Sequence, residues 1–446
     1  MKKAPSPLVS LIPIIVLVLL LFATIRTFGS DALSGGSQVS LLTTTAICIL
    51  IGMVFYKIPW KDYELAITNN IAGVATAIII LLIIGALSGI WMISGVVPTL
   101  IYYGMQIIHP SFFLASTCII CALISVMTGS SWTTIATIGI ALMGIGKAQG
   151  FEDGWIAGAI ISGAYFGDKI SPLSETTILA SSITDTPLFR HIRYMMITTV
   201  PSLVITLIIF TVAGFSHDAN NTQHIAEVAT ALNEKFHITP WLLIVPVATG
   251  ILIAKKVPSI VTLFLSTLLA AVFALIFQPD LLEEISGIAA SGFDSLFKGL
   301  MMTIYGETNL HTNNAVLTDL IATRGMSGMM NTIWLILCAM CFGGAMTASG
   351  MVGSITSIFV RFMKKTVSVV SATVCSGLFL NLTTADQYIS IILTGNMFRD
   401  IYAKKGYESC LLSRTTEDAV TVTSVLIPWN SCGMTQATIL KIGRAS

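Results

Sequence analysis

The stretch GDKISPLSETT (residues 167–177) places ionisable side chains in the middle of a long apolar segment. Pro172 lacks the backbone donor that a helix needs, so it predicts a break whose free carbonyl groups and helix ends attract a cation. An ionisable residue at membrane depth costs roughly 2.5–3.5 kcal/mol on insertion scales, which favours a partner or a function for Asp168 and Glu175. Lys169 is a simple neutralising partner for Asp168, and the alternative is a pairing that changes with conformation.

A second stretch of the same kind, SRTTEDAVTVTSVLIPWNSCG (413–433), places Glu417 and Asp418 side by side ahead of Pro428. Arg414 precedes the two acids by three and four positions, so an ion pair within one helix is the structural explanation. One arginine cannot fully neutralise two carboxylates, and adjacent carboxylates raise each other's pKa. The functional explanation is therefore that Glu417 or Asp418 carries a proton.

Two further apolar stretches have polar centres, TGSSWTT at 128–134 and NLTTADQY at 381–388. A spanning helix with such a centre would expose backbone groups to lipid. Each stretch is therefore predicted to be a re-entrant hairpin, over 111–146 and 366–398, with its tip buried in protein. Hydroxyl and carboxylate oxygens are the ligands that hard cations prefer. The candidate ion- or substrate-binding residues are Ser130, Ser131, Thr133, Asp168, Ser174, Glu175, Thr383, Thr384, Asp386, Glu417, Asp418 and Asn430, with sodium expected on Ser130, Asp168, Thr384 and Asp386.

The elements that must position these residues are membrane helices. Hydrophobic residues make up 54% of the 446 residues and charged residues only 10%, with a mean hydropathy of +0.87. A soluble fold of this length cannot bury that much apolar surface. The net charge of +1 argues against nucleic-acid binding, which needs a basic face. The sequence has no P-loop and no hydrolase motif, so neither an enzyme, an ATP-driven pump nor a bound cofactor is expected.

A bilayer is crossed by about 20 apolar residues in a helix. The first apolar run, 8–28, follows Lys2 and Lys3 and has the charge pattern of a signal peptide. Its length and the lack of a cleavage site favour a membrane helix instead. The remaining predicted spans are 39–56, 71–94, 155–186 (interrupted), 194–215, 241–254, 258–277, 332–350 and 408–440 (interrupted).

The two halves of the chain share one spacing. KAQGFEDG (147–154) aligns with AKKGYESC (403–410) at an offset of 256, and Pro172 aligns with Pro428 at the same offset. The two predicted hairpin tips align at nearly the same offset. Such a repeat at low identity predicts two halves of similar structure.

Lysine and arginine residues predict the orientation of the halves, because cytoplasmic loops carry an excess of both. With the amino terminus in the cytoplasm, the first hairpin enters from outside and the second from inside. Inverted repeats with interrupted helices are typical of secondary transporters, whose site lies near the middle of the membrane. The predicted organisation is a first inverted repeat at 1–215, an external connecting loop at 216–240, and a second repeat at 241–446 whose final helix is expected to be missing.

The motif GAYFGDKISPLSETTILASSI (163–183), the stretch 413–433, and the shorter GSSWTT and TADQY resemble the NhaC-type sodium/proton antiporter family over most of the chain. The resemblance implies exchange of sodium for protons. Relatives of that family exchange organic acids, such as malate for lactate, or take up amino acids. The resemblance also implies roles for residues at the motif positions, and Glu175 stands where the family pattern SPLSDTT has aspartate. The implied functional positions are Asp168, Ser174, Asp386 and Asp418.

The sequence therefore predicts an all-α polytopic protein of the cytoplasmic (inner) membrane, built from two inverted-topology repeats, each with a re-entrant hairpin and an interrupted helix. Its predicted function is the exchange of sodium for protons, with a homodimer as the expected assembly. The alternative is a sodium- or proton-coupled carrier of organic acids or amino acids, in which Arg414 or Lys169 meets a substrate carboxylate. An intramembrane enzyme or a channel is the third alternative. His191, in the basic turn RHIR, is expected to face water or lipid headgroups.

Overall fold

The computed structural model describes residues 5–28, 35–216, 222–288, 290, 292–308, 310, 312, 318, 321–355 and 366–442. Within these residues the regular elements are helices, with one isolated bridge between Thr308 and Thr323. Eight of the described helices are long and apolar enough to cross a membrane, or up to nine if a bent pair counts as one span. The prediction of an all-α polytopic membrane protein is confirmed.

The helices of the first half run from the amino terminus to residue 216. They are α1 (Pro7–Phe28), α2 (Gly36–Tyr56), α3 (Trp60–Gly73), α4 (Ala75–Ile93), α5 (Val96–Ile107), η2 (Pro110–Phe112), α6 (Phe113–Thr128), α7 (Ser131–Thr134), η3 (Ile135–Gly139, a π-helical turn), α8 (Ile140–Ala148), α9 (Asp153–Ile170), α10 (Glu175–Ile183) and α11 (Leu188–Ser216).

The described helices of the second half run from residue 222 to residue 439. They are α12 (Thr222–Lys235), η4 (Pro240–Leu243), α13 (Ile244–Ala254), α14 (Ser259–Phe277), α15 (Pro279–Ser286), α16 (Phe293–Tyr305), η5 (Gly325–Met329), α18 (Met330–Ala348), α20 (Thr366–Thr384), α21 (Gln387–Lys404), α22 (Ser409–Ser424) and α23 (Ser431–Ile439).

Five α-helices lie mostly or wholly outside the predicted spans and hairpins, namely α3, α5, α12, α15 and α16. The segment 216–240, predicted as an external connecting loop, contains α12. Val228 and Leu232 of α12 are fully buried, so the helix is held by one apolar stripe that a search for continuous apolar runs does not find. The helices α3 and α5 were missed for a similar reason, since both are shorter than a membrane span.

Each predicted hairpin consists of two helices on either side of a residue with left-handed backbone. Gly129 (φ 65°) ends α6, and Ala385 (φ 56°) ends α20. The next residue in each case caps the following helix. The Ser130 hydroxyl accepts a hydrogen bond from the Thr133 amide at 3.2 Å, and Asp386 accepts one from the Ile389 amide at 3.0 Å. Both pairs of equivalent positions are 256 residues apart.

The two predicted interruptions are present at the prolines. The helix α9 ends at Ile170 and α10 begins at Glu175, while α22 ends at Ser424 and α23 begins at Ser431. Side chains cap the helix after each break. The Ser174 hydroxyl accepts from the Thr177 amide at 3.4 Å, and the Asn430 side chain accepts from the Cys432 amide at 3.1 Å.

Helices α6 and α9 pack together through small residues. A Cβ atom added at Gly163 would lie 2.1 Å from the Cys118 carbonyl oxygen, and one added at Gly167 would lie 2.2 Å from the Ala122 carbonyl oxygen. The Ser125 hydroxyl also donates to a carbonyl oxygen of α9 at 2.5 Å. The first hairpin is therefore fixed closely against the first interrupted helix.

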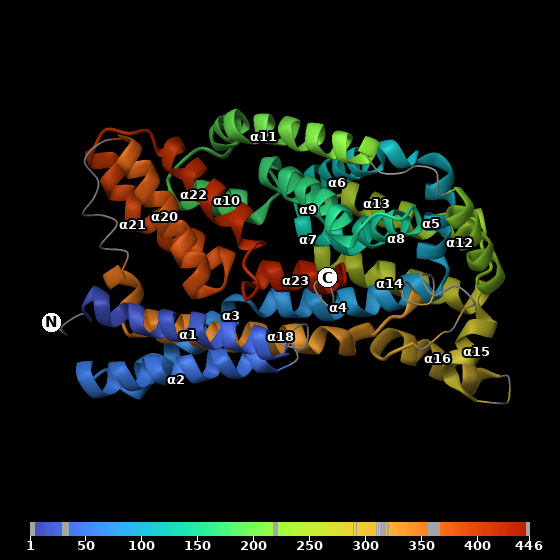
Figure 1. Cartoon of the computed structure of the whole chain (residues 1–446), viewed down its shortest axis with the longest axis horizontal. Coiled ribbons are helices and arrows are strands. Elements are labelled where there is room, and N and C mark those ends of the chain that lie inside the picture. The colour runs from blue at the N-terminus through green and yellow to red at the C-terminus, as the bar shows by residue number, and fades with distance from the viewer. Residues whose placement is uncertain are drawn as a thin grey trace.

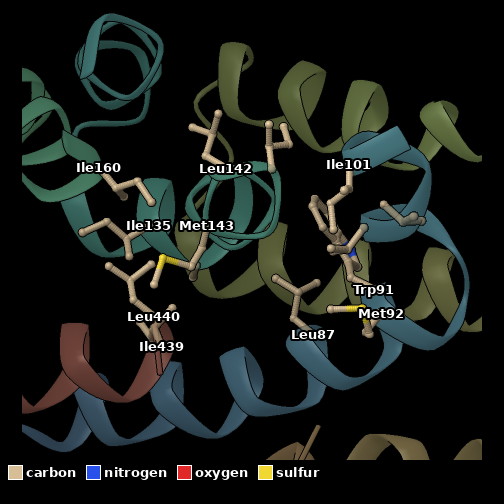
Figure 2. Packing of buried hydrophobic residues seen from close by; sticks show 14 of the residues in the cluster. Leu87, Trp91, Met92, Ile101, Ile135, Leu142, Met143, Ile160, Ile439 and Leu440 are labelled. Atoms are coloured by element: carbon tan, nitrogen blue, oxygen red, sulfur yellow. The ribbon is translucent and has the colours of Figure 1, made fainter. Parts of the chain in front are cut away.

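The two halves share one apolar core. Figure 2 shows Ile439 and Leu440, at the end of α23, beside Ile135 and Met143 of the first hairpin, with Leu87 of α4 in the same cluster. In Figure 1, α20 and α21 lie at one end of the molecule, and α5, α12 and α15 lie at the other. The last described helix, α23, thus packs against helices of both halves.

Replacing Gly167 with alanine tests the close packing of α6 and α9. The added methyl group would meet backbone, which cannot move aside as a flexible side chain does. We expect a loss of roughly 1–3 kcal/mol of stability, the usual cost of overpacking. Gly154→Ala, in the same helix, is the matched control, because its Cβ would have no atom within 4 Å. Thermal unfolding in lipid nanodiscs measures both, and equal midpoints would contradict the packing described.

Candidate functional site

The first hairpin tip is bonded to the first interrupted helix by Asp168. This residue lies in the last turn of α9 and is 7% exposed. Its Oδ2 accepts hydrogen bonds from the Ser131 amide at 3.1 Å and from the Ser131 hydroxyl at 2.8 Å. Ser174 lies close to the same carboxyl group. Hydrogen bonds of this kind stabilise the ionised form of a buried carboxylate and fix its orientation.

The second hairpin tip is bonded to the second interrupted helix by Asp386, which is 2% exposed. One of its oxygens caps α21, and the other accepts a hydrogen bond from the Ser431 hydroxyl at 3.0 Å. The Ser431 amide donates to the carbonyl oxygen of Ala385 at 2.8 Å. The element that carries the carboxylate differs between the halves. In the first half it is the interrupted helix, and in the second half it is the hairpin.

A single cavity of about 690 Å³ is lined by residues of the two hairpin tips and of the first break. Lys256, in the turn between α13 and α14, lines it and is exposed, as are Thr76 and Glu175. Apolar side chains such as Met127 and Ile389 form part of the wall. The predicted site residues that line the cavity are Ser130, Thr133, Asp168, Ser174, Glu175 and Asp386.

Tyr388 is a cavity residue that sequence reasoning missed. It follows Asp386 by two positions, and its hydroxyl donates a hydrogen bond of 3.0 Å to Oε2 of Glu175. This bond joins the second hairpin to the helix that follows the first break. The aromatic residue in TADQY was visible in the sequence, but its partner lies 213 positions away.

The carboxylates that line the cavity outnumber its cations. Asp168, Glu175 and Asp386 contribute three carboxyl groups, and Lys256 is the single lysine or arginine among the described lining residues. A cation entering this space therefore meets an attractive field and oxygen ligands from both halves.

A second polar cluster lies outside the cavity, between α9, α22 and α11. Lys169 forms a salt bridge with Oδ1 of Asp418, whose Oδ2 accepts from the Thr198 hydroxyl at 3.0 Å. The Arg414 Nε atom lies 3.9 Å from the same Oδ2. The simple pairing of Lys169 with Asp168 is therefore wrong. The ion pair expected within one helix is present between Arg414 and Asp418, and not between Arg414 and Glu417. The lysine turns away from the cavity toward a helix of the other half, a contact that local spacing cannot reveal.

Glu417 lies between the two groups. Its side chain is 0% exposed, and its carboxyl group lies near Lys169 of the second cluster and near Thr176, which lines the cavity. Neither carboxyl oxygen forms a hydrogen bond of ordinary geometry among the described residues, so the charge of this carboxyl group depends on its surroundings.

His191 also differs from expectation. It is fully buried, and its Nδ1 lies 2.8 Å from the Ser413 hydroxyl. The predicted exposure to water or headgroups is wrong, because α11 begins at Leu188 and carries the histidine inward against α22.

The remaining predicted site residues support the tips and breaks from behind the cavity. The Thr384 hydroxyl donates to the Asp386 carbonyl oxygen at 3.1 Å, and the Thr383 hydroxyl donates to the Phe379 carbonyl oxygen at 3.0 Å. The Asn430 side-chain amide donates to the Asn381 carbonyl oxygen at 3.3 Å. These groups, and Ser131 behind Asp168, are not among the described residues that line the cavity.

Comparison with known proteins adds independent information. A sequence model described as the Na+/H+ antiporter family matches residues 163–444. The chain is 35% identical to the Na(+)/H(+) antiporter NhaC of Bacillus subtilis, over 90% of this chain and 86% of that protein. It is 36% identical to the malate-2H(+)/Na(+)-lactate antiporter of the same organism, over 92% of this chain and 84% of that protein. It is also 36% identical to the NhaC antiporter of Alkalihalophilus pseudofirmus, over 89% and 83% of the two chains.

The matched region includes the end of α9, both breaks, the second hairpin and the three carboxyl groups that line the cavity. Because the family match spans more than half of the sequence and the relatives are similar over nearly all of it, this chain belongs to the Na+/H+ antiporter family.

Proposed function

We propose that this protein exchanges sodium ions for protons across the cell membrane. The observation that carries the proposal is the meeting of Asp168 and Asp386, one from each half, at a single cavity whose acids outnumber its lysines and arginines. A carboxyl group binds either a proton or a cation, so one site of this kind couples the two by competition. The family and its sodium/proton antiporters support this reading.

We also propose that the two halves are inverted-topology repeats with re-entrant hairpins. The matching caps at Ser130 and Asp386, and the matching breaks before Glu175 and Ser431, lie at one offset of 256 and support the repeat. The hairpins extend from opposite ends of the molecule in Figure 1, which supports the inversion. The exposed Lys256 supports a cavity that opens toward the cytoplasm in this proposal, because cytoplasmic loops carry an excess of lysine and arginine. The expected homodimer stays a prediction.

Sodium is proposed to bind between Asp168 and Asp386, with the Ser130 hydroxyl as a further ligand. Both hydrogen bonds from Ser131 converge on Oδ2 of Asp168, which leaves Oδ1 as the oxygen that can reach a cation in the cavity. Thr384 supports this site indirectly, because its hydroxyl is bonded to the backbone of the tip. Glu417, which is buried near Lys169 and the cavity residue Thr176, is the candidate for a proton carried beside the cation site.

The charge at Asp386 can be removed without removing the cap of α21. Asp386→Asn keeps an oxygen for the Ile389 amide, since asparagine caps helices as well as aspartate does. We expect the apparent sodium affinity to fall roughly 10- to 100-fold, as the loss of a charged ligand worth about 1.5–3 kcal/mol predicts. Sodium-dependent proton movement in proteoliposomes measures it, with Asp294→Asn, exposed on α16, as the control.

Two results of that assay would count against the proposals. Absence of any pH change when sodium is added to the unaltered protein would overturn sodium/proton exchange. Equal sodium affinity in the Asp386 and Asp294 variants would remove Asp386 from the site while leaving the exchange itself standing.

The salt bridge between Lys169 and Asp418 is expected to stabilise the contact between the halves. Lys169→Met leaves Asp418 without its main partner, so we expect a loss of roughly 2–4 kcal/mol, below the full cost for a buried pair because Asp418 is 27% exposed. The double variant Lys169→Met/Asp418→Leu should recover part of that loss. Lys235→Met, which breaks the more exposed pair with Glu284, should cost at most about 1 kcal/mol. Denaturation in nanodiscs distinguishes the four proteins, and additive losses in the double variant would contradict the pairing.

An organic-acid or amino-acid carrier is the second candidate, favoured by the size of the cavity. A volume of about 690 Å³ with apolar side chains in its wall exceeds the space that a bare cation needs. One of the relatives is a malate-2H(+)/Na(+)-lactate antiporter. Uptake of labelled malate, lactate and amino acids into proteoliposomes, with and without a sodium gradient, separates the two. Gradient-dependent accumulation of one of them would favour the carrier, and none would be expected of a sodium/proton exchanger.

A further inference from the structure

Two buried polar side chains lie beside the carboxylates but away from the cavity, and neither forms a hydrogen bond of ordinary geometry. Gln436 of α23 is 1% exposed, and among the described residues neither its amide oxygen nor its amide nitrogen forms such a bond. The buried Tyr165 hydroxyl of α9 interacts with Gln436 and Cys432, but also without ordinary hydrogen-bond geometry. Each such group is destabilising when it is kept from water without a well-formed hydrogen bond. A native protein that accepts this cost at adjacent positions needs a reason for it.

The two side chains are neighbours that come from different halves. Tyr165 lies close to both Gln436 and Cys432. It precedes Asp168 by three positions, about one helical turn, and Gln436 follows the Asp386 partner Ser431 by five positions. Tyr165 is thus about one turn from Asp168, and Gln436 is about one and a half turns from the serine that is bonded to Asp386.

The pair lies toward the end of the molecule opposite Lys256. Tyr165 precedes Asp168 on α9 and so lies on the side of Asp153, where this helix begins. Gln149 lies just before that end of α9, and its amide donates to the Ile108 carbonyl oxygen, at the end of α5, at 2.9 Å. Figure 1 shows α5 and α12 at that end. Neither Tyr165 nor Gln436 is among the described residues that line the cavity.

Apolar packing closes this region. Ile439 and Leu440 follow Gln436 on the same helix and pack against Ile135 and Met143 of the first hairpin, as Figure 2 shows. A shift of α23 relative to the first hairpin would separate this packing and admit water to the polar pair, because the amide and the hydroxyl can both bind water.

We propose that Tyr165 and Gln436 line a second polar compartment, which takes water and a hydrated alkali cation when the site opens toward the α5–α12 end. This inference rests on the proposed exchange by alternating access. In the structure described here the compartment is shut and the cavity beside Lys256 is open. The amide oxygen of Gln436 is a suitable ligand for a hard cation, and its nitrogen donates to water.

Cysteine accessibility tests the compartment without depending on transport. Gln436→Cys is made in a Cys432→Ser background, so that the neighbouring thiol does not react. A membrane-impermeant methanethiosulfonate reagent is applied to right-side-out and to inside-out vesicles. We expect labelling from the side of the α5–α12 end and loss of that labelling from the side of Lys256.

Ala180→Cys in the same background is the matched control. Ala180 precedes Gln436 by 256 positions, lies on the equivalent helix α10, and is 0% exposed in an apolar cluster with Ile391 and Val420. It should not be labelled from the α5–α12 side. Labelling of Gln436→Cys only from the Lys256 side, or from neither side, would overturn the compartment and leave a plain internal contact between Gln436 and Tyr165.

Tyr165→Phe provides a second measurement if the cysteine variant does not fold. It removes one hydroxyl and keeps the ring that packs against α23. We expect slower exchange when sodium is supplied at the α5–α12 side, with unchanged apparent affinity from the Lys256 side. An equal change from both sides would contradict a one-sided compartment. Failure of sodium/proton exchange in the unaltered protein, with one-sided labelling retained, would overturn the proposed function and not the compartment.

Discussion

The arrangement of this protein depends on a buried carboxylate that joins each hairpin tip to an interrupted helix. Asp168 accepts two hydrogen bonds from Ser131, and Asp386 accepts one from Ser431 while it caps its own helix. Chain breaks are tolerated at membrane depth only where other groups satisfy the backbone. The serine contacts and the caps do this here, so the groups that make the breaks possible also form the polar space between the halves.

The two halves solve this problem with the carboxylate on opposite partners. In the first half the acid belongs to the interrupted helix, and in the second half it belongs to the hairpin. Both acids therefore reach the same cavity, although the halves are matched residue by residue at their caps and breaks. A fully symmetric chain would have placed both acids on hairpins or both on interrupted helices. The Tyr388 contact with Glu175 adds a direct link between the halves at the same place.

The polar residues of the core fall into separate groups. The cavity holds acids with room for a cation. The cluster of Lys169, Asp418 and Thr198 is internally paired, and it joins α9, α22 and α11. Glu417 lies between the two groups, near Lys169 and Thr176, and its carboxyl oxygens form no hydrogen bond of ordinary geometry in the described part of the chain. Paired groups fix the relative position of helices, whereas unpaired buried groups respond to water or ions, so the two kinds are suited to different tasks.

The sequence alone determined the membrane setting, the two breaks and the position of both hairpin tips. Composition decides whether a chain folds in lipid or in water, and Pro172 and Pro428 each interrupt the helix at their own position. These features therefore need no knowledge of distant contacts. Short amphipathic helices such as α12 were not predicted, because they bury only one apolar stripe of side chains against a neighbouring element. Tertiary structure alone decided which charges meet. Lys169 pairs with an acid 249 positions away instead of its sequence neighbour, because the packing of α9 against α22 fixes where the lysine points.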